Sequence, residues 1–217
     1  MEFFMGKGKK FFEFATKLAQ LMWLNILTIL CSLPVITMGS AFTAMHYVLI
    51  QIYRDEENKI TRSYFSSFKK NFWHSTKIWL IYLVFYAIML VDYWALKNLD
   101  NSTIRYLNIL VPALVFIGSL SMLWSFVLQA RYELSVKDTL VFSITRIIAF
   151  PLRTLAMGIA FLAPFALGIY FPRFFIIVPL LGISGGGILC TWFYNGALKV
   201  MEDDDEEGDK NESESTS

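Results

Sequence analysis

The chain has few charged residues and few cysteines, and it lacks the common catalytic motifs. Charged side chains make up 17% of its 217 residues, against about 25% in an average soluble domain. It has no Walker loop, His-Glu-x-x-His, Gly-x-Ser-x-Gly or dinucleotide-binding fingerprint. Cys31 and Cys190 lie in apolar segments without neighbours at metal-ligand spacing, and we expect no disulfide between them. These absences argue against an enzyme, so we expect no catalytic residue, cofactor or metal.

Hydrophobic residues dominate instead, at 56% of the chain with a mean hydropathy of +0.51. In lipid every backbone N–H and C=O must be satisfied internally, and helices do this within one segment. We therefore predict an all-α fold, a polytopic transmembrane helical bundle with about six membrane segments. These are residues 18–33, 40–53, 78–96, 107–130, 154–171 and 174–198.

The first two segments form the hairpin around which the chain is organised. Pro34 removes a backbone donor and ends the first helix, and Gly39 allows the chain to reverse. The second segment, residues 40–53, is about 21 Å long as a helix, shorter than a hydrocarbon core of about 30 Å. Either it starts earlier, at Met38, or it enters the membrane without fully crossing.

Two stretches predict amphipathic interfacial helices on the cytoplasmic side. Residues 54–77 combine six cations with Phe65, Phe68 and Phe72 at helical spacing. Residues 131–150 carry an apolar stripe of Val136, Leu140, Ile144 and Ile147, and Pro151 ends that helix. The predicted organisation is an interfacial amphipathic segment over 1–17, one transmembrane domain over 18–201, and an acidic disordered tail over 202–217.

Charge is distributed unevenly along the chain. Residues 202–217 hold nine acidic residues and one lysine, whereas residues 1–201 hold 18 Lys and Arg against nine acids. With a cytoplasmic N-terminus, 16 of the 19 cations lie on the inner side, and Lys97, Arg105 and Arg173 lie outside. We therefore predict a multi-pass membrane protein with both termini cytoplasmic. A hairpin that enters the membrane without crossing it leaves all later loops on the same sides. The charge distribution therefore does not distinguish such a hairpin from two crossing helices.

A few polar residues within the apolar segments are candidate functional positions. Asp92 is the only acid inside a span, but it lies four residues before Lys97 and so near the outer surface. His46 is a candidate because an unperturbed histidine titrates near neutral pH, and Asn25 is one of several groups able to line a cavity. Hydrogen bonding between helices explains each of these residues equally well.

Three further candidates, Arg131, Gly182 and Ser184, lie near the inner side and in the last segment. Arg131 ends the fourth span, where an anchor or an ion pair is the simpler interpretation. Gly182 and Gly186 have the small-xxx-small spacing that lets helices approach closely, although a helix break there is an alternative. The basic patches lie beside apolar stripes, which favours anionic lipids over nucleic acid as their partner.

Several short motifs resemble those of the YesL family of bacterial membrane proteins, whose biochemical function is unassigned. They are Leu24-Asn25-x-Leu27, Ser32-Leu33-Pro34-Val35-x-Thr37-x-Gly39, Arg54-Asp55-Glu56-Glu57, Phe65-x-x-Phe68-Lys69-x-Asn71-Phe72, Ser75-Thr76 with Trp79-Leu80, Gln129-Ala130-Arg131-Tyr132 and Leu181-Gly182-x-Ser184. Many relatives carry Pro where this chain has Ser40, a difference that bears on where the second helix starts. The resemblance supplies no catalytic residue.

The resemblance implies a membrane protein encoded beside ABC importers for oligosaccharides. We therefore expect an accessory or regulatory partner of a carbohydrate ABC import system that binds permease subunits through the helices at 60–75 and 132–150; self-association stays open. The alternative is a transporter or channel in its own right, for example a permease-like subunit. Six spans suit a permease, but Thr139 stands where a permease docking loop has its central glycine.

Overall fold

The computed structural model describes residues 2–56, 59–97, 107–132, 134–170 and 181–196, and all of its regular structure is helical. The predicted all-α class is confirmed. The named elements are α1 (Glu2–Ser32), the short 3₁₀ helix η1 (Val35–Thr37), α2 (Met38–Tyr53), α3 (Ile60–Lys97), α5 (Leu107–Tyr132), α6 (Val136–Ala149) and α7 (Pro151–Tyr170). Residues 181–196 form a further helix. Five helices are long and apolar enough to cross a membrane: Phe12–Ser32, Val35–Tyr53, Ile60–Lys97, Ile109–Tyr132 and Pro151–Tyr170.

The predicted turn between the first two helices is confirmed. α1 ends at Ser32, and Pro34 has the extended conformation that precedes η1. The Thr37 hydroxyl donates to the carbonyls of Cys31 and Pro34, at 2.6 and 2.8 Å, and so satisfies acceptors left free at the end of α1. α1 runs without interruption from Glu2, so no break in the helix marks the predicted boundary at residue 17.

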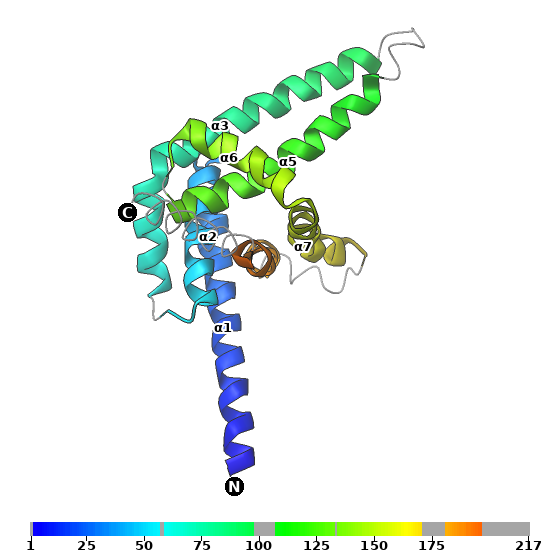
Figure 1. Cartoon of the computed structure of the whole chain (residues 1–217). Helices are drawn as coiled ribbons and strands as arrows, with labels where there is room; N and C mark the ends of the chain where they lie inside the picture. The colour runs from blue at the N-terminus through cyan, green and yellow to red at the C-terminus, as the bar shows by residue number, and fades with distance from the viewer. Residues whose placement is uncertain (1, 57–58, 98–106, 133, 171–180, 197–217) are drawn as a thin grey trace, which may run out of the picture.

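Helix α2 forms the centre of the molecule (Figure 1). It begins at Met38, the earlier of the two predicted starts, and 11 of its 16 residues are buried. One face packs against α1 and α3 in a cluster that includes Leu24, Met45 and Tyr64. Ile50 belongs to a second cluster, which includes Trp124 of α5 and Tyr194 of the last helix.

The structure of α3 differs from the prediction for residues 54–96. A surface helix over 54–77 and a separate span over 78–96 were expected, but a single helix of 38 residues covers both. The sequence from 60 to 97 has no glycine or proline to end a helix between them. Figure 1 shows that α3 changes direction along its length and that its second half pairs with α5 in an arm that projects from the body.

The predicted helix before Pro151 is confirmed as α6, and three residues of its predicted apolar stripe, Val136, Leu140 and Ile147, pack against the apolar clusters. Ser135 caps it by accepting a hydrogen bond from the backbone N–H of Asp138, at 3.3 Å. The fully buried residues are Thr139 and Ser143, whereas Ile144 of the predicted apolar stripe is 51% exposed. Thr139 and Ser143 lie on the same side of α6 as Val136, Leu140 and Ile147, so polar and apolar side chains share the buried face.

The last two predicted spans are matched in part. α7 starts at Pro151, where a proline is well tolerated because the first helical N–H has no partner within the helix. Within the predicted sixth segment, 174–198, residues 181–196 are helical, and the rest lies outside the described residues. The acidic tail over 202–217 also lies outside them.

Candidate functional site

Buried polar side chains join α2 to the first half of α3. Ser40 lies 3.1 Å from the Thr76 hydroxyl, and Thr43 donates to Ser75 at 2.9 Å. All four side chains are buried. These hydrogen bonds join the two helices and satisfy the polar groups that their packing buries.

The same seam of polar residues continues into α5 and α6. Gln129 of α5 donates to Asn71 of α3 at 3.4 Å and accepts from Thr139 of α6 at 3.0 Å. Further along, the Tyr82 hydroxyl lies 2.7 Å from Ser121, which lies 2.7 Å from Ser143. We call this set the polar seam: Ser40, Thr43, Asn71, Ser75, Thr76, Tyr82, Ser121, Gln129, Thr139 and Ser143. Its members bond to one another, which is the behaviour of groups that hold helices together.

Asn25 and Ser184, far apart in sequence, are brought together. The Asn25 Oδ1 accepts hydrogen bonds from the backbone N–H groups of Ile183 and Ser184, at 3.1 and 3.0 Å. In return the Ser184 hydroxyl donates to the carbonyl of Leu21 at 2.8 Å. Both side chains are fully buried, and Gly182 is buried beside them. This arrangement anchors the last helix to α1.

Gly39 lies where α2 and α3 approach most closely. A Cβ built on Gly39 would lie 2.7 Å from the Cβ of Trp79 and closer still to the backbone carbonyl of Ser75. Pro34 and η1 form the turn that precedes Gly39. The Trp79 indole N–H donates a hydrogen bond to the carbonyl of Val35 at 2.7 Å. The residues that lead the chain through this turn therefore act by positioning α2.

The two titratable candidates within the spans are not brought together. His46 is buried in α2, with its ring centroid 6.1 Å from that of Tyr194 in an edge-to-face arrangement. Its Nδ1 is buried without a hydrogen-bond partner. Asp92 lies exposed near the end of α3. Among the described residues no group of three His, Cys, Asp or Glu side chains is placed to hold a metal, and both cysteines are free thiols.

Arg131 belongs to a cluster that sequence reasoning did not assemble. Its Nη1 donates to the Oδ1 of Asn195 at 3.2 Å, linking α5 to the last helix. Arg153 in the first turn of α7 lies close by, since a Cβ on Gly196 would be 3.8 Å from its Nη1. The Arg153 Nη1 and the Asn195 Nδ2 are buried without hydrogen-bond partners. No sequence pattern indicates this cluster, because its residues lie far apart along the chain.

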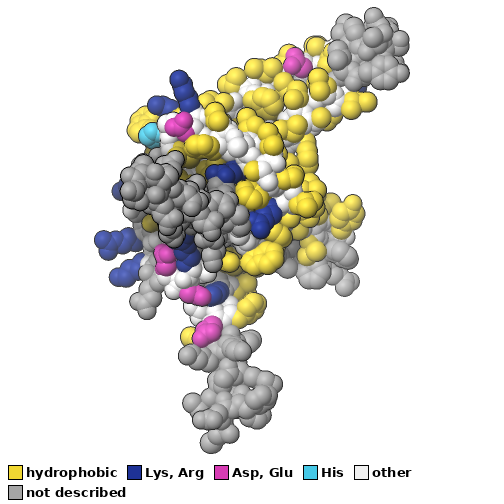
Figure 2. Space-filling model, viewed as in Figure 1, with side chains coloured by type: hydrophobic (Ala, Val, Ile, Leu, Met, Phe, Trp, Pro, Cys, Tyr) yellow, Lys and Arg dark blue, Asp and Glu magenta, His cyan; other side chains and the backbone are white. Residues whose placement is uncertain are grey.

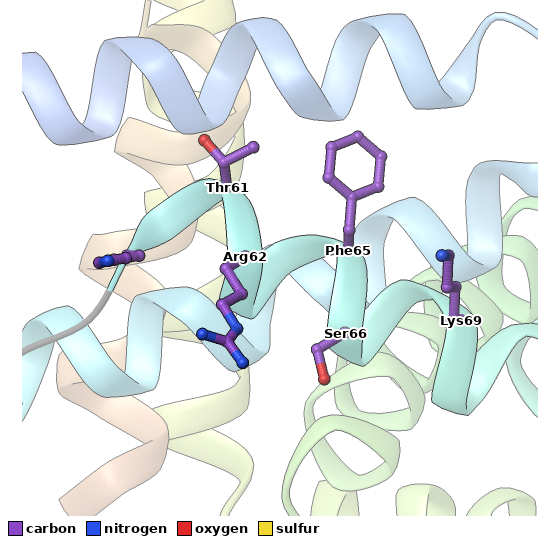
Figure 3. Close-up of a pocket in the computed structure, with 6 residues that line it drawn as sticks. Thr61, Arg62, Phe65, Ser66 and Lys69 are labelled. Atoms are coloured by element: carbon purple, nitrogen blue, oxygen red, sulfur yellow. The ribbon is translucent and has the colours of Figure 1, made fainter.

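A cationic pocket of about 620 Å³ lies at the start of α3 (Figure 3). Its lining residues are Lys59, Thr61, Arg62, Phe65, Ser66 and Lys69. Figure 3 shows the Thr61 and Phe65 side chains pointing to one side of α3, while Arg62 and Ser66 point to the other. The Thr61 hydroxyl accepts a hydrogen bond from the Trp23 indole at 2.9 Å, which ties this part of α3 to α1. Cations, hydroxyls and one ring suit an anionic group on an amphiphilic or protein partner.

A crevice of about 530 Å³ between α5 and α7 has a different character. It is lined almost entirely by apolar side chains, among them Pro112, Phe116 and Leu162. Such a lining fits lipid chains and gives no hydroxyl-binding groups for a sugar.

Comparison with known proteins finds one family. Residues 21–93 match the family described as "Protein of unknown function, DUF624". The match covers α2, most of α3 and the part of α1 that packs on them, and it includes most of the motifs on which the resemblance rests. No curated protein and no solved structure matches the chain.

Proposed function

We propose that this protein is a non-catalytic accessory or regulatory partner of a carbohydrate ABC importer in the bacterial plasma membrane. The resemblance to YesL-like proteins supports the link to carbohydrate import, and the family match over residues 21–93 is consistent with it. The observation that carries an interaction role is the set of exposed cations on the first half of α3: Arg62, Lys69, Lys70 and Lys77. These cations also attract the anionic headgroups of the inner leaflet.

The length of α3 supports a particular arrangement in the membrane. Its 38 residues span about 57 Å, nearly twice a hydrocarbon core of about 30 Å. Residues 78–97 alone fill that thickness, and they expose apolar side chains such as Ile88, Leu90 and Trp94. The first half of α3 then lies outside the hydrocarbon, on the cytoplasmic side, where its cations avoid the cost of burial in lipid.

Packing supports a position for the α1–α2 hairpin at the membrane surface. α2 runs back along the first half of α3: Ser40 meets Thr76, and Ile52 shares an apolar cluster with Tyr64. If that half lies outside the hydrocarbon, α2 lies there too. The hairpin thus sits at the cytoplasmic surface without crossing, with the exposed apolar side chains of α1, such as Leu30, in the lipid.

Thiol labelling tests this orientation. In a Cys31→Ser background, Asn101→Cys should react with an impermeant reagent added to intact cells. Ile36→Cys, in the exposed turn after α1, should react only in inside-out vesicles, and so should Lys69→Cys. Labelling of Ile36→Cys from outside would mean that α1 crosses the membrane, and the surface hairpin would have to be abandoned.

Affinity capture from native membranes tests the accessory role. Permease subunits of an oligosaccharide importer should co-purify with the full chain. Arg62→Glu combined with Lys69→Glu should lose them, because the charge of the cationic pocket is reversed. Lys97→Glu, at the far end of α3, is the matched control and should retain them. Recovery of lipids and the protein alone would contradict the role.

The alternative is a transporter in its own right, and a liposome assay distinguishes the two. The apolar crevice between α5 and α7 and the internally bonded polar seam give that alternative little support. Purified protein in liposomes should therefore fail to move an oligosaccharide. Unaided transport that is lost when the protein is denatured would favour the alternative.

A further inference from the structure

We propose that the acidic tail over residues 202–217 binds in the cationic pocket at the start of α3. The tail holds nine acidic residues and one lysine. The described residues that line the pocket include three cations, Lys59, Arg62 and Lys69, and no acid. The contact itself needs no importer. Its regulatory consequence rests on the proposed function, because a pocket filled by the tail is closed to a permease.

The three cations of the pocket have no anionic partner among the described residues. Their side chains are all exposed, and neither of the two ion pairs found in the described part of the chain involves them. Like charges that share a pocket repel one another, and an anionic occupant offsets that repulsion. The pocket therefore favours a ligand with several negative charges.

The spacing of the cations favours an extended acidic segment as that ligand. Arg62 and Lys69 both line the pocket, seven residues apart, which places them on one face of α3 and about 10 Å apart along its axis. Lys59 lies just before the helix begins. Six consecutive acids, residues 202–207, extend over at most about 20 Å. Such a row of carboxylates matches cations distributed along a helix better than one compact headgroup does.

Two hydroxyl groups add neutral donors to the lining. The Thr61 hydroxyl accepts a hydrogen bond from the Trp23 indole at 2.9 Å, so its own proton is available to another acceptor. Ser66 is exposed on the same side of α3 as Arg62 (Figure 3). Carboxylate oxygens accept from hydroxyl groups as well as from ammonium and guanidinium groups. The lining and the tail therefore match in donors and acceptors as well as in charge.

The chain that follows the last described helix is long enough to reach the pocket. Ile188 of that helix and Ile60 at the start of α3 pack against the same apolar cluster, which contains Ile52. The six acids begin six residues after Gly196, where the described part of the helix ends. Residues 197–207 can extend over about 36 Å. A segment tethered at this range has an effective concentration on the order of 1 mM, so individually weak ion pairs suffice to fill the pocket.

Disulfide cross-linking of the full chain tests the contact. In a Cys31→Ser background, Ser66→Cys places a thiol in the pocket and Gly208→Cys places one directly after the six acids. Mild oxidation of the purified protein in phosphatidylcholine nanodiscs should join the two thiols within one chain. Lys137→Cys, exposed on α6 and outside the pocket, is the matched control for Ser66→Cys and should form little product. Equal amounts of product at positions 66 and 137 would overturn the proposal.

Two changes of charge distinguish binding from random collision of a tethered segment. Replacing the six acids with the corresponding amides should slow cross-linking about tenfold, because the ion pairs to three exposed cations are lost. Raising the salt from about 0.1 M to about 1 M should also slow it, because the Debye length falls from about 10 Å to about 3 Å. An unchanged rate with the amide tail would contradict a contact made through charge.

Other occupants of the pocket would give different products. Cross-linking between two chains, seen as a dimer, would mean that the tail binds a second copy. Loss of the product in phosphatidylglycerol nanodiscs, with retention in phosphatidylcholine, would mean that an anionic headgroup displaces the tail. Either result overturns the proposal.

Affinity capture from native membranes tests the consequence for the importer. The amide tail leaves the pocket open, so more permease should co-purify, by up to the same factor as cross-linking slows. Unchanged capture would overturn the regulatory consequence. Absence of permease from every variant, with the cross-link within one chain still formed, would contradict the importer role but not the contact. Absence of that cross-link would contradict the contact whatever the capture shows.

Discussion

The two halves of α3 bury and expose opposite kinds of side chain. The first half buries Ser67, Asn71 and Ser75 against its neighbours and exposes cations. The second half has no fully buried residue after Tyr82 and exposes a nearly continuous apolar surface. In Figure 2 hydrophobic side chains cover the arm that contains the second half, while Lys and Arg gather over the body.

This difference shows how one uninterrupted helix serves two environments. Where protein surrounds α3, paired hydroxyl and amide groups hold it. Where lipid surrounds it, apolar side chains face outward and only the contact with α5 is specific. The helical backbone is the same in both environments, because its hydrogen bonds are satisfied internally in each.

Substitution by lysine should give the largest difference between the two halves of α3, measured as the cost of membrane insertion. Ile88→Lys places a charge on the exposed face near the middle of the second half, and we expect a cost of about 3 kcal/mol in membrane insertion. Trp73→Lys replaces a larger and more exposed side chain, 71% exposed, in the first half and should cost little. The fraction of each variant recovered in the membrane after expression measures the effect. Equal losses for both would show that the two halves share one environment.

Glycine substitution should give a smaller difference in the opposite direction, with the larger loss of stability in the first half of α3. Gly39→Ala forces α2 away from the backbone of the first half, since its Cβ meets the carbonyl of Ser75, and about 2 kcal/mol of stability should be lost. Gly118→Ala in α5 meets only the Phe85 ring of the second half, at 2.6 Å from its Cε1. That ring can rotate away into lipid, so the loss should be well under half as large. Thermal unfolding in detergent checks both, and Gly185→Ala, with its nearest contact at 3.7 Å, is the neutral control.

Much of the fold follows from the sequence, for physical reasons that apply to particular residues. Pro34 and Gly39 mark the hairpin because a missing donor and a missing Cβ act locally. The distinct characters of 54–77 and 78–96 were also predicted correctly from charge. The break between them was predicted wrongly, because a change of environment was taken for a change of structure. No helix-breaking residue lies there.

The candidate site was only partly predictable. Asn25 and Ser184 were both identified as candidates, yet their contact spans 159 positions and has no sequence signal. Arg131 was identified without its neighbours Asn195 and Arg153, because tertiary packing alone brings the ends of three helices together. The apolar part of the buried face of α6 was predicted, but Thr139 and Ser143 were not, because their hydrogen bonds to Gln129 and Ser121 depend on tertiary packing.

A double-mutant cycle on the polar seam should show the smallest effect of these experiments. It compares the strength of a single hydrogen bond in each half of α3. Asn71→Ala and Gln129→Ala each remove one partner of the 3.4 Å hydrogen bond that ties the first half of α3 to α5. A hydrogen bond within a protein contributes about 0.5–1.5 kcal/mol on balance, because the separated partners bond to water instead. Unfolding of the two single variants and the double variant in detergent should give a coupling of that size. Tyr86 and Ser119, whose hydroxyls lie 3.1 Å apart and only half-buried along the second half, provide the comparison pair and should couple more weakly. Stronger coupling at Tyr86 than at Asn71 would mean that polar contacts hold the lipid-facing half, contrary to the division drawn between the two halves of α3.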